Sequence, residues 1–195
     1  IMNDDGSMAR RDDLLKFGEK HNLKVGTIAD LIDYKLSKES TIENVHTKKV
    51  TTEFGEFILD VWRDVIFDEH HFSLTKGSPE KVDVPMVRVQ TQSVLQDTLG
   101  IDEIGKKWSI RKSLQKISEE GTGVFVLINH RDAKTYWLSS LKDENIEPKR
   151  NRRVIGIGSQ ILRAIGLNKI KVLGTPTKYS GLSGFNIEIE GFIDE

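Results

Sequence analysis

The hydrophobic pattern of this chain changes from strand-like to helical between residues 90 and 110, and that change constrains the fold more than any other sequence feature. Before it, strand-like segments with turn residues between them occupy residues 45–53, 57–66, 72–75 and 84–90. These segments predict an antiparallel meander or a barrel-like sheet. After it, Ile110, Leu114 and Ile117 have the spacing of an amphipathic helix. We therefore expect a mixed α/β (α+β) fold with an antiparallel, β-rich first half and an α/β second half.

The second half alternates between helical and strand-like patterns. Its helices are expected to end at glycines, as at Gly121 and Gly166. The expected elements are a strand at 123–128, helices at 135–141 and 160–165, and strands at 169–173 and 186–190. A glycine turn at 156–159 is expected to precede the second of these helices.

The sequence before residue 45 has a different character. Its pattern predicts a surface helix between Met8 and Leu23, a short strand at 23–25 and a helix that begins at Thr27. The polar stretch after this helix is nearly free of large apolar residues, which is typical of a linker. We therefore predict three parts: residues 1–36, a linker at 37–44 and a domain at 45–195.

Composition excludes several classes of protein. The 195 residues include no cysteine, so disulfides, thiolate nucleophiles and zinc sites built on sulfur are excluded, and a metal would need the 5 histidines and the carboxylates. No apolar run approaches the roughly 20 residues that span a bilayer. The net charge of −1 provides no overall attraction to nucleic acid or anionic lipid. We expect a soluble, cytoplasmic protein that binds neither nucleic acid nor membranes.

A basic cluster precedes the expected helix at 160–165. It contains Lys149, Arg150, Arg152 and Arg153, and guanidinium groups near the start of a helix can bind phosphate. A solvated basic loop explains the same pattern equally well. The glycines after this cluster lack the third glycine of a dinucleotide fingerprint, because residue 161 is Ile, and no Gly-Lys-Ser/Thr comes after them.

The histidines provide weak signals for a site. His70 and His71 are adjacent in an expected strand, so their side chains should point to opposite faces and cannot share one ion without a bulge. His130-Arg131-Asp132 comes after the strand at 123–128, at a strand end where α/β proteins often place functional residues. A surface ion pair is the more common explanation of such a loop.

Two stretches of the sequence resemble known families. Residues 1–10, together with Asp13-Leu14 and 27–32, resemble the C-terminal end of 3,4-dihydroxy-2-butanone-4-phosphate synthase. The remainder of the sequence resembles the GTP cyclohydrolase II half of bifunctional riboflavin-biosynthesis proteins, in which the two domains are fused in this order. The matching pieces of this second stretch are 87–89, Asp97, Gly100, Ile117 with 119–123, 155–163, Gly166 and 169–173.

The first resemblance implies that the chain begins inside the synthase domain. Residues 1–35 would then pack onto strands that the chain does not contain. We therefore expect this region to be poorly ordered or to be held by another chain.

The departures from the cyclohydrolase family concern its chemistry. Active members hold a catalytic zinc with three cysteines, and the flanking matches place Ser93, Ile104 and Lys106 at those positions. None of these residues supplies a thiolate, and without the ion there is no Lewis acid and no activated water. The resemblance also places 132–135 at a Gly-Arg-Gly segment of the family, Ile155 at a tyrosine and 174–177 at a Thr-Asn-Asn-Pro segment. Together these differences predict a cyclohydrolase fold that has lost its chemistry.

The resemblance implies a function for the parent polypeptide. The synthase, a lyase that uses Mg²⁺, would be the enzyme. The GTP cyclohydrolase II-like domain would be an inactive structural or regulatory module in a homodimer, with no zinc and no other cofactor in this chain. It would still bind a phosphorylated metabolite or nucleotide through Arg88, Arg150, Arg152 and Arg153.

Two alternatives remain open at this point. The domain could be an active GTP cyclohydrolase or nucleotide hydrolase with a metal site that does not use cysteine, for which His130, Asp132 and Asp97 are the candidate ligands. It could also be purely structural and bind no ligand.

Overall fold

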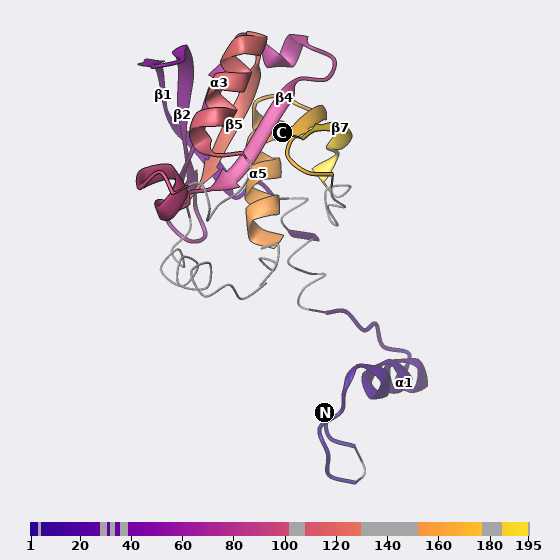
Figure 1. Ribbon diagram of the computed structural model, residues 1–195. Coiled ribbons are helices and arrows are strands. Elements are labelled where there is room, and N and C mark those ends of the chain that lie inside the picture. Colours follow the sequence, from indigo (N-terminus) through magenta and orange to yellow (C-terminus); the bar gives the residue numbers. More distant parts are fainter. Residues whose placement is uncertain are drawn as a thin grey trace.

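The fold is built on one seven-stranded mixed sheet with the strand order β1-β2-β3-β5-β4-β6-β7 (Figure 1). The computed structural model describes residues 1–3, 5–27, 31, 34–35, 39–101, 108–129, 152–176 and 185–194. The antiparallel pairs are β1–β2, β2–β3 and β3–β5. The parallel pairs are β5–β4, β4–β6 and β6–β7.

Helices flank this sheet and precede it. The strands are β1 (Ile42–Thr52), β2 (Gly55–Asp64), β3 (Glu69–Lys76), β4 (Met86–Thr91), β5 (Gly123–Ile128), β6 (Lys169–Leu173) and β7 (Glu188–Ile193). The helices are α1 (Arg11–His21), α3 (Ile110–Glu120) and α5 (Arg152–Ala164), with the short helical turns η1 (Pro79–Lys81) and η2 (Val94–Thr98).

The predicted meander is confirmed for β1, β2 and β3, but it is wrong for the fourth segment. β4 does not continue it; β5 pairs with β3 instead, and β4 lies parallel to β5. The chain between β4 and β5 contains α3, and a strand–helix–strand connection places its two strands parallel. The sheet is therefore antiparallel on the β1 side and parallel on the β7 side.

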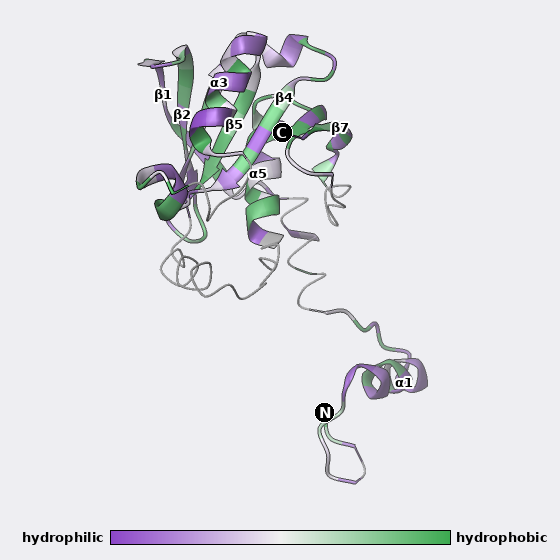
Figure 2. Ribbon diagram, in the orientation of Figure 1, coloured by the Kyte–Doolittle hydropathy of each residue, from purple (hydrophilic) through white to green (hydrophobic). Residues whose placement is uncertain are grey.

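One face of the sheet is covered by α3. Its N-cap is Ser109, whose hydroxyl accepts a hydrogen bond from the Lys112 N–H, and it ends at Gly121 in the left-handed conformation, as predicted. The hydrophobic core on this face consists of Phe57, Met86, Trp108, Leu114, Ile117, Phe125 and Leu173. Figure 2 shows β5 as hydrophobic along its length, which fits a strand buried on both faces.

The opposite face is covered by α5. Side chains alternate along a strand, so the residues on either side of one that faces α3 point toward α5. The core here includes Val87, Val124, Val126 and Ile128 from the strands and Ile157, Ile161 and Leu162 from α5. Helix, sheet and helix therefore form three layers.

The start of α5 differs from the prediction. We expected a glycine turn at 156–159 and a helix from residue 160, whereas α5 begins at Arg152 and contains both glycines. The reason is packing, because a Cβ on Gly158 would lie 2.8 Å from Cγ1 of Val89. Glycine at this position allows the helix to approach β4 closely.

The N-terminal region agrees with the prediction in part. The surface helix is present as α1, whereas residues 23–25 form no strand. β1 begins at Ile42, inside the stretch predicted as a linker. The expected helix at 135–141 lies outside the described residues. In the described part of the chain, no helix has the length and apolar character needed to cross a membrane.

Candidate functional site

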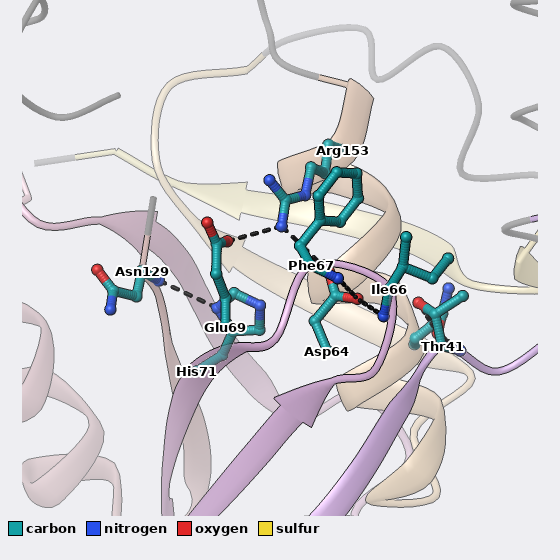
Figure 3. A network of polar contacts seen from close by, with 9 residues as sticks. Thr41, Asp64, Ile66, Phe67, Glu69, His71, Asn129 and Arg153 are labelled. Carbon is teal, nitrogen blue, oxygen red and sulfur yellow. Dashed lines mark hydrogen bonds and ion pairs between the residues drawn. The ribbon is translucent and has the colours of Figure 1, made fainter. Parts of the chain in front are cut away.

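A buried polar cluster lies where the β2–β3 turn meets the end of β5 and the first turn of α5 (Figure 3). Its members are Asp64, Glu69, His71 and Arg153, together with the Asn129 backbone. The strand-end location is typical of functional sites in α/β proteins. Of the predicted site residues, Arg153 belongs to this cluster.

Arg153 is held by two carboxylates. Its Nη2 donates to Oε2 of Glu69 at 2.6 Å and to Oδ2 of Asp64 at 3.2 Å. The side chains of Asp64 and Glu69 are only 2% and 6% exposed, whereas that of Arg153 is 22% exposed. The guanidinium carbon also lies 3.7 Å from the ring centroid of Phe67, in a cation–π contact.

Asp64 shapes the turn as well as holding the helix. Its Oδ1 accepts hydrogen bonds from the backbone N–H groups of Ile66 at 3.0 Å and Phe67 at 3.4 Å. Its other oxygen faces Arg153. The two oxygens of one carboxylate therefore join the β2–β3 turn to the start of α5.

His71 is buried beside these carboxylates, whereas its neighbour His70 is exposed, so the two rings point to opposite faces as predicted. Nδ1 of His71 accepts a hydrogen bond from the Asn129 N–H at 3.2 Å, which requires an unprotonated Nδ1. Burial lowers the pKa of His71 below its usual value, and the charges of Asp64 and Glu69 oppose this shift. The imidazole is therefore neutral in this arrangement.

Arg88 lies on β4, outside this cluster, and is bonded to three other groups. Its Nη1 donates to the Leu173 carbonyl at 2.6 Å, its Nη2 to the Trp108 carbonyl at 3.2 Å and its Nε to Oε1 of Gln90 at 2.8 Å. Gly174 makes room for this guanidinium, because a Cβ there would lie 3.1 Å from Nη1. Arg88 therefore joins β4 to β6 and to the segment before α3.

The segment that resembles the start of the family's zinc site is held by hydrogen bonds. Ser93 is the N-cap of η2, and its N–H donates to Oδ2 of Asp97 at 2.7 Å. Oδ1 of Asp97 accepts from the Ile110 N–H at 3.0 Å, at the start of α3. Both oxygens of the alternative ligand Asp97 thus bind backbone N–H groups.

The donor set at this segment does not fit a zinc ion held by cysteines. Ser93 carries a hydroxyl where a thiolate is needed, and its oxygen accepts a hydrogen bond from the Gln96 N–H. No group of three or more His, Cys, Asp or Glu side chains within the described ranges is arranged to hold a metal. Ile104 and Lys106 lie outside those ranges.

The remaining predicted site residues are not described. Arg150, His130 and Asp132 lie outside the described residues, and of Arg152 only the backbone is described, in α5. Phosphate binding by the four arginines therefore stays a prediction. Nη2 of Arg153 is already held by two buried carboxylates, so a phosphate at that nitrogen would have to displace them, and removing the partner of a buried ion pair costs about 3–5 kcal/mol.

Sequence reasoning missed Asp64 and Glu69 as partners of Arg153. Asp64 and Glu69 have the character of ordinary turn residues, and no spacing rule connects them with residue 153. A weak signal was available in the two adjacent histidines, because one of them had to face the core. The sequence did not indicate what His71 would meet there.

The matches to family models divide the chain into two parts. Residues 43–194 match the model of GTP cyclohydrolase II, and residues 1–34 match the model of 3,4-dihydroxy-2-butanone 4-phosphate synthase. The resemblance stated from the motifs is thereby supported for both parts.

Individual relatives cover nearly the whole chain. A 3,4-dihydroxy-2-butanone 4-phosphate synthase of Pseudomonas aeruginosa is 35% identical over 99% of this chain and 54% of its own length. Riboflavin biosynthesis protein RibBA of Aquifex aeolicus is 34% identical over 97% of this chain and 50% of its own length. The chain thus spans about half the length of these curated relatives.

A solved structure has the same fold. RibBX of A. baumannii, described as a two-domain 3,4-dihydroxy-2-butanone 4-phosphate synthase, matches with a TM-score of 0.71 and 34% identity, over 100% of this chain and 53% of that one. With most of its length matched to one family model, this chain belongs to the GTP cyclohydrolase II family, and its residues 1–34 match the 3,4-dihydroxy-2-butanone 4-phosphate synthase family.

Proposed function

We propose that this chain is the C-terminal part of a riboflavin-biosynthesis protein in which the GTP cyclohydrolase II-like domain is not catalytic. One observation carries the proposal: a chain without cysteine has Ser93 at the position where the resemblance implies a zinc thiolate. The two oxygens of Asp97 are occupied by backbone N–H groups, which argues against its use as a replacement ligand. Without a Lewis acid, the domain lacks the means to activate water for ring opening.

The names of the relatives favour the synthase as the active partner. Proteins called 3,4-dihydroxy-2-butanone 4-phosphate synthase share 35% and 38% identity with this chain over nearly all of it. In such a protein the synthase would use Mg²⁺, and the GTP cyclohydrolase II-like domain would support it as a structural or regulatory module, in a homodimer. Binding of a phosphorylated metabolite or nucleotide belongs to this proposal, with Arg150 and Arg152 as its remaining candidates. Arg88 and Arg153 are better explained as structural arginines.

The first experiment measures metal content and GTP turnover of the purified chain. We expect neither stoichiometric zinc nor turnover when GTP is supplied with added divalent ions. Zinc at one ion per chain together with product formation would overturn the proposal and require a new ligand set.

The supporting role needs a second experiment on the fused protein. The synthase rate with ribulose 5-phosphate and Mg²⁺ is compared before and after removal of residues 43–195. We expect the rate or the dimer to be lost or altered on removal. An unchanged rate and an unchanged oligomeric state would show that the domain neither supports nor regulates the synthase.

A further inference from the structure

Two polar side chains on the same side of α5 contact the residue before β1 and the last residue of β2. Arg153 and Gln160 are seven residues apart, which is two helical turns, so their side chains share a face about 10 Å apart along the axis. Ile157, between them, belongs to the core. On this face of the helix, a polar side chain therefore lies one turn before and one turn after the core residue Ile157.

Gln160 binds the residue that immediately precedes β1. Its Oε1 accepts hydrogen bonds from the Thr41 N–H at 2.7 Å and from the Thr41 hydroxyl at 3.2 Å. Thr41 and Gln160 are 6% and 7% exposed, so water competes little for these groups. The position of Thr41 thus depends on a side chain 119 residues away.

Thr41 is bonded to the β2–β3 turn as well. Its carbonyl accepts from the Val65 N–H at 2.9 Å, and Val65 directly follows Asp64, the residue that holds Arg153. Figure 3 shows Thr41 beside this turn, with Arg153 on its other side. The contacts therefore form a closed circuit that runs from α5 through Arg153 to the turn, from the turn to Thr41, and back to α5 through Gln160.

We propose that α5 braces the domain at two points, and that Arg153 and Gln160 are positioning residues that hold the β2–β3 turn and the start of β1 as one unit. Thr41 directly precedes β1, seven residues after the end of the segment that matches the synthase model. The brace thereby fixes where the chain enters the first strand of the GTP cyclohydrolase II-like domain. If the domain regulates a synthase, as proposed above, this brace is the route by which a change at the start of α5 reaches Thr41, at the start of β1.

Amide hydrogen exchange on the whole chain tests the Gln160 contact. Gln160→Met keeps the side-chain volume and removes the acceptor, so the Thr41 amide should exchange about tenfold faster. Gln160→Glu retains an acceptor oxygen and should restore protection. The matched control is Gln115→Met on the exposed side of α3, which should leave the Thr41 amide unchanged.

The decisive variant is Arg153→Gln, because it alters the other end of the brace. We expect faster exchange of the Thr41 amide, although the hydrogen bonds described for Arg153 go to Asp64 and Glu69. Arg163→Gln, which alters an exposed cation of the same helix, should cause no change. If Arg153→Gln does not fold, Arg153→Lys weakens the contact and keeps the charge. Unchanged exchange at Thr41, with faster exchange confined to the Ile66 and Phe67 amides, would overturn the brace.

These measurements need no synthase activity. A failure of the brace is therefore distinguishable from a failure of the proposed function. If Arg153→Gln alters the exchange of the Thr41 amide but leaves the synthase rate of the fused protein unchanged, the brace is supported and a regulatory role is not.

Discussion

Gly158 of α5 lies against Val89 of β4 so closely that a Cβ on the glycine would be 2.8 Å from Cγ1 of the valine. Their contact lies between α5 and the parallel part of the sheet, where Val89 packs against the core that includes Ile157 and Ile161. Real side chains do not approach to this distance, so one of the two elements would have to move. The contact sets how near α5 lies to β4, and with it the positions of Arg153 and Gln160.

Gly158→Ala should destabilise the domain. The substitution gains up to about 1 kcal/mol in helix propensity but overpacks the contact, at a cost of about 1–3 kcal/mol. We expect a net loss of about 1 kcal/mol in urea unfolding. In a Val89→Ala background the clash is removed, and the same substitution should be neutral or stabilising. Equal losses in both backgrounds would contradict the packing argument.

His71 should make stability depend on pH. Its pKa in the folded protein lies below the usual value of 6.5, so between the two values the unfolded chain binds the proton more readily. The contribution of neutral His71 to the free energy of unfolding is complete above about pH 6.5. It decreases as the pH falls below this value, by at most about 1.4 kcal/mol per pH unit.

The two adjacent histidines provide a matched pair for this measurement. His71→Gln should reduce the fall in the free energy of unfolding between pH 7 and pH 5, as followed by urea unfolding. His70→Gln, at the exposed neighbour, should retain the wild-type slope. If the two variants give the same slope, His71 is not the titrating group.

Arg88 should behave as a structural residue. Arg88→Met leaves the Leu173 and Trp108 carbonyls without this donor, and we expect a loss of about 2–3 kcal/mol in the free energy of unfolding. Arg63→Met is the control, because Arg63 pairs with Asp68 at the surface and should cost at most about 1 kcal/mol. A phosphate-binding role would instead predict lost affinity for inorganic phosphate with little loss of stability.

Asp97 should hold η2 against the start of α3. In Asp97→Asn one oxygen is replaced by an NH₂ group that cannot accept from an N–H, so we expect a loss of about 1–2 kcal/mol. The Ser93 or the Ile110 amide should exchange faster, since both use Asp97 as acceptor and Asn retains only one acceptor oxygen. Glu119→Gln, on the exposed side of α3, serves as the control and should leave both measurements unchanged.

The sequence by itself determined the local elements and one chemical limit. Strand-like segments separated by turn residues identified β1–β3, and helical spacing with Gly121 identified α3. The absence of cysteine excluded a thiolate-held metal. These inferences depend only on neighbouring residues or on composition. Only the tertiary structure decided that β5 lies between β3 and β4, and that the glycines at 156 and 158 lie within α5.

The same division applies to the arginines and histidines. The basic cluster before a helix marked Arg153 as a phosphate candidate, and the family resemblance added Arg88. Neither could show that carbonyls and carboxylates from distant segments hold these side chains. The sequence placed His70 and His71 on opposite faces but could not say which face is buried. Burial and pairing depend on residues far apart in the chain, such as Asp64 and Arg153, which become neighbours only when the sheet and α5 pack together.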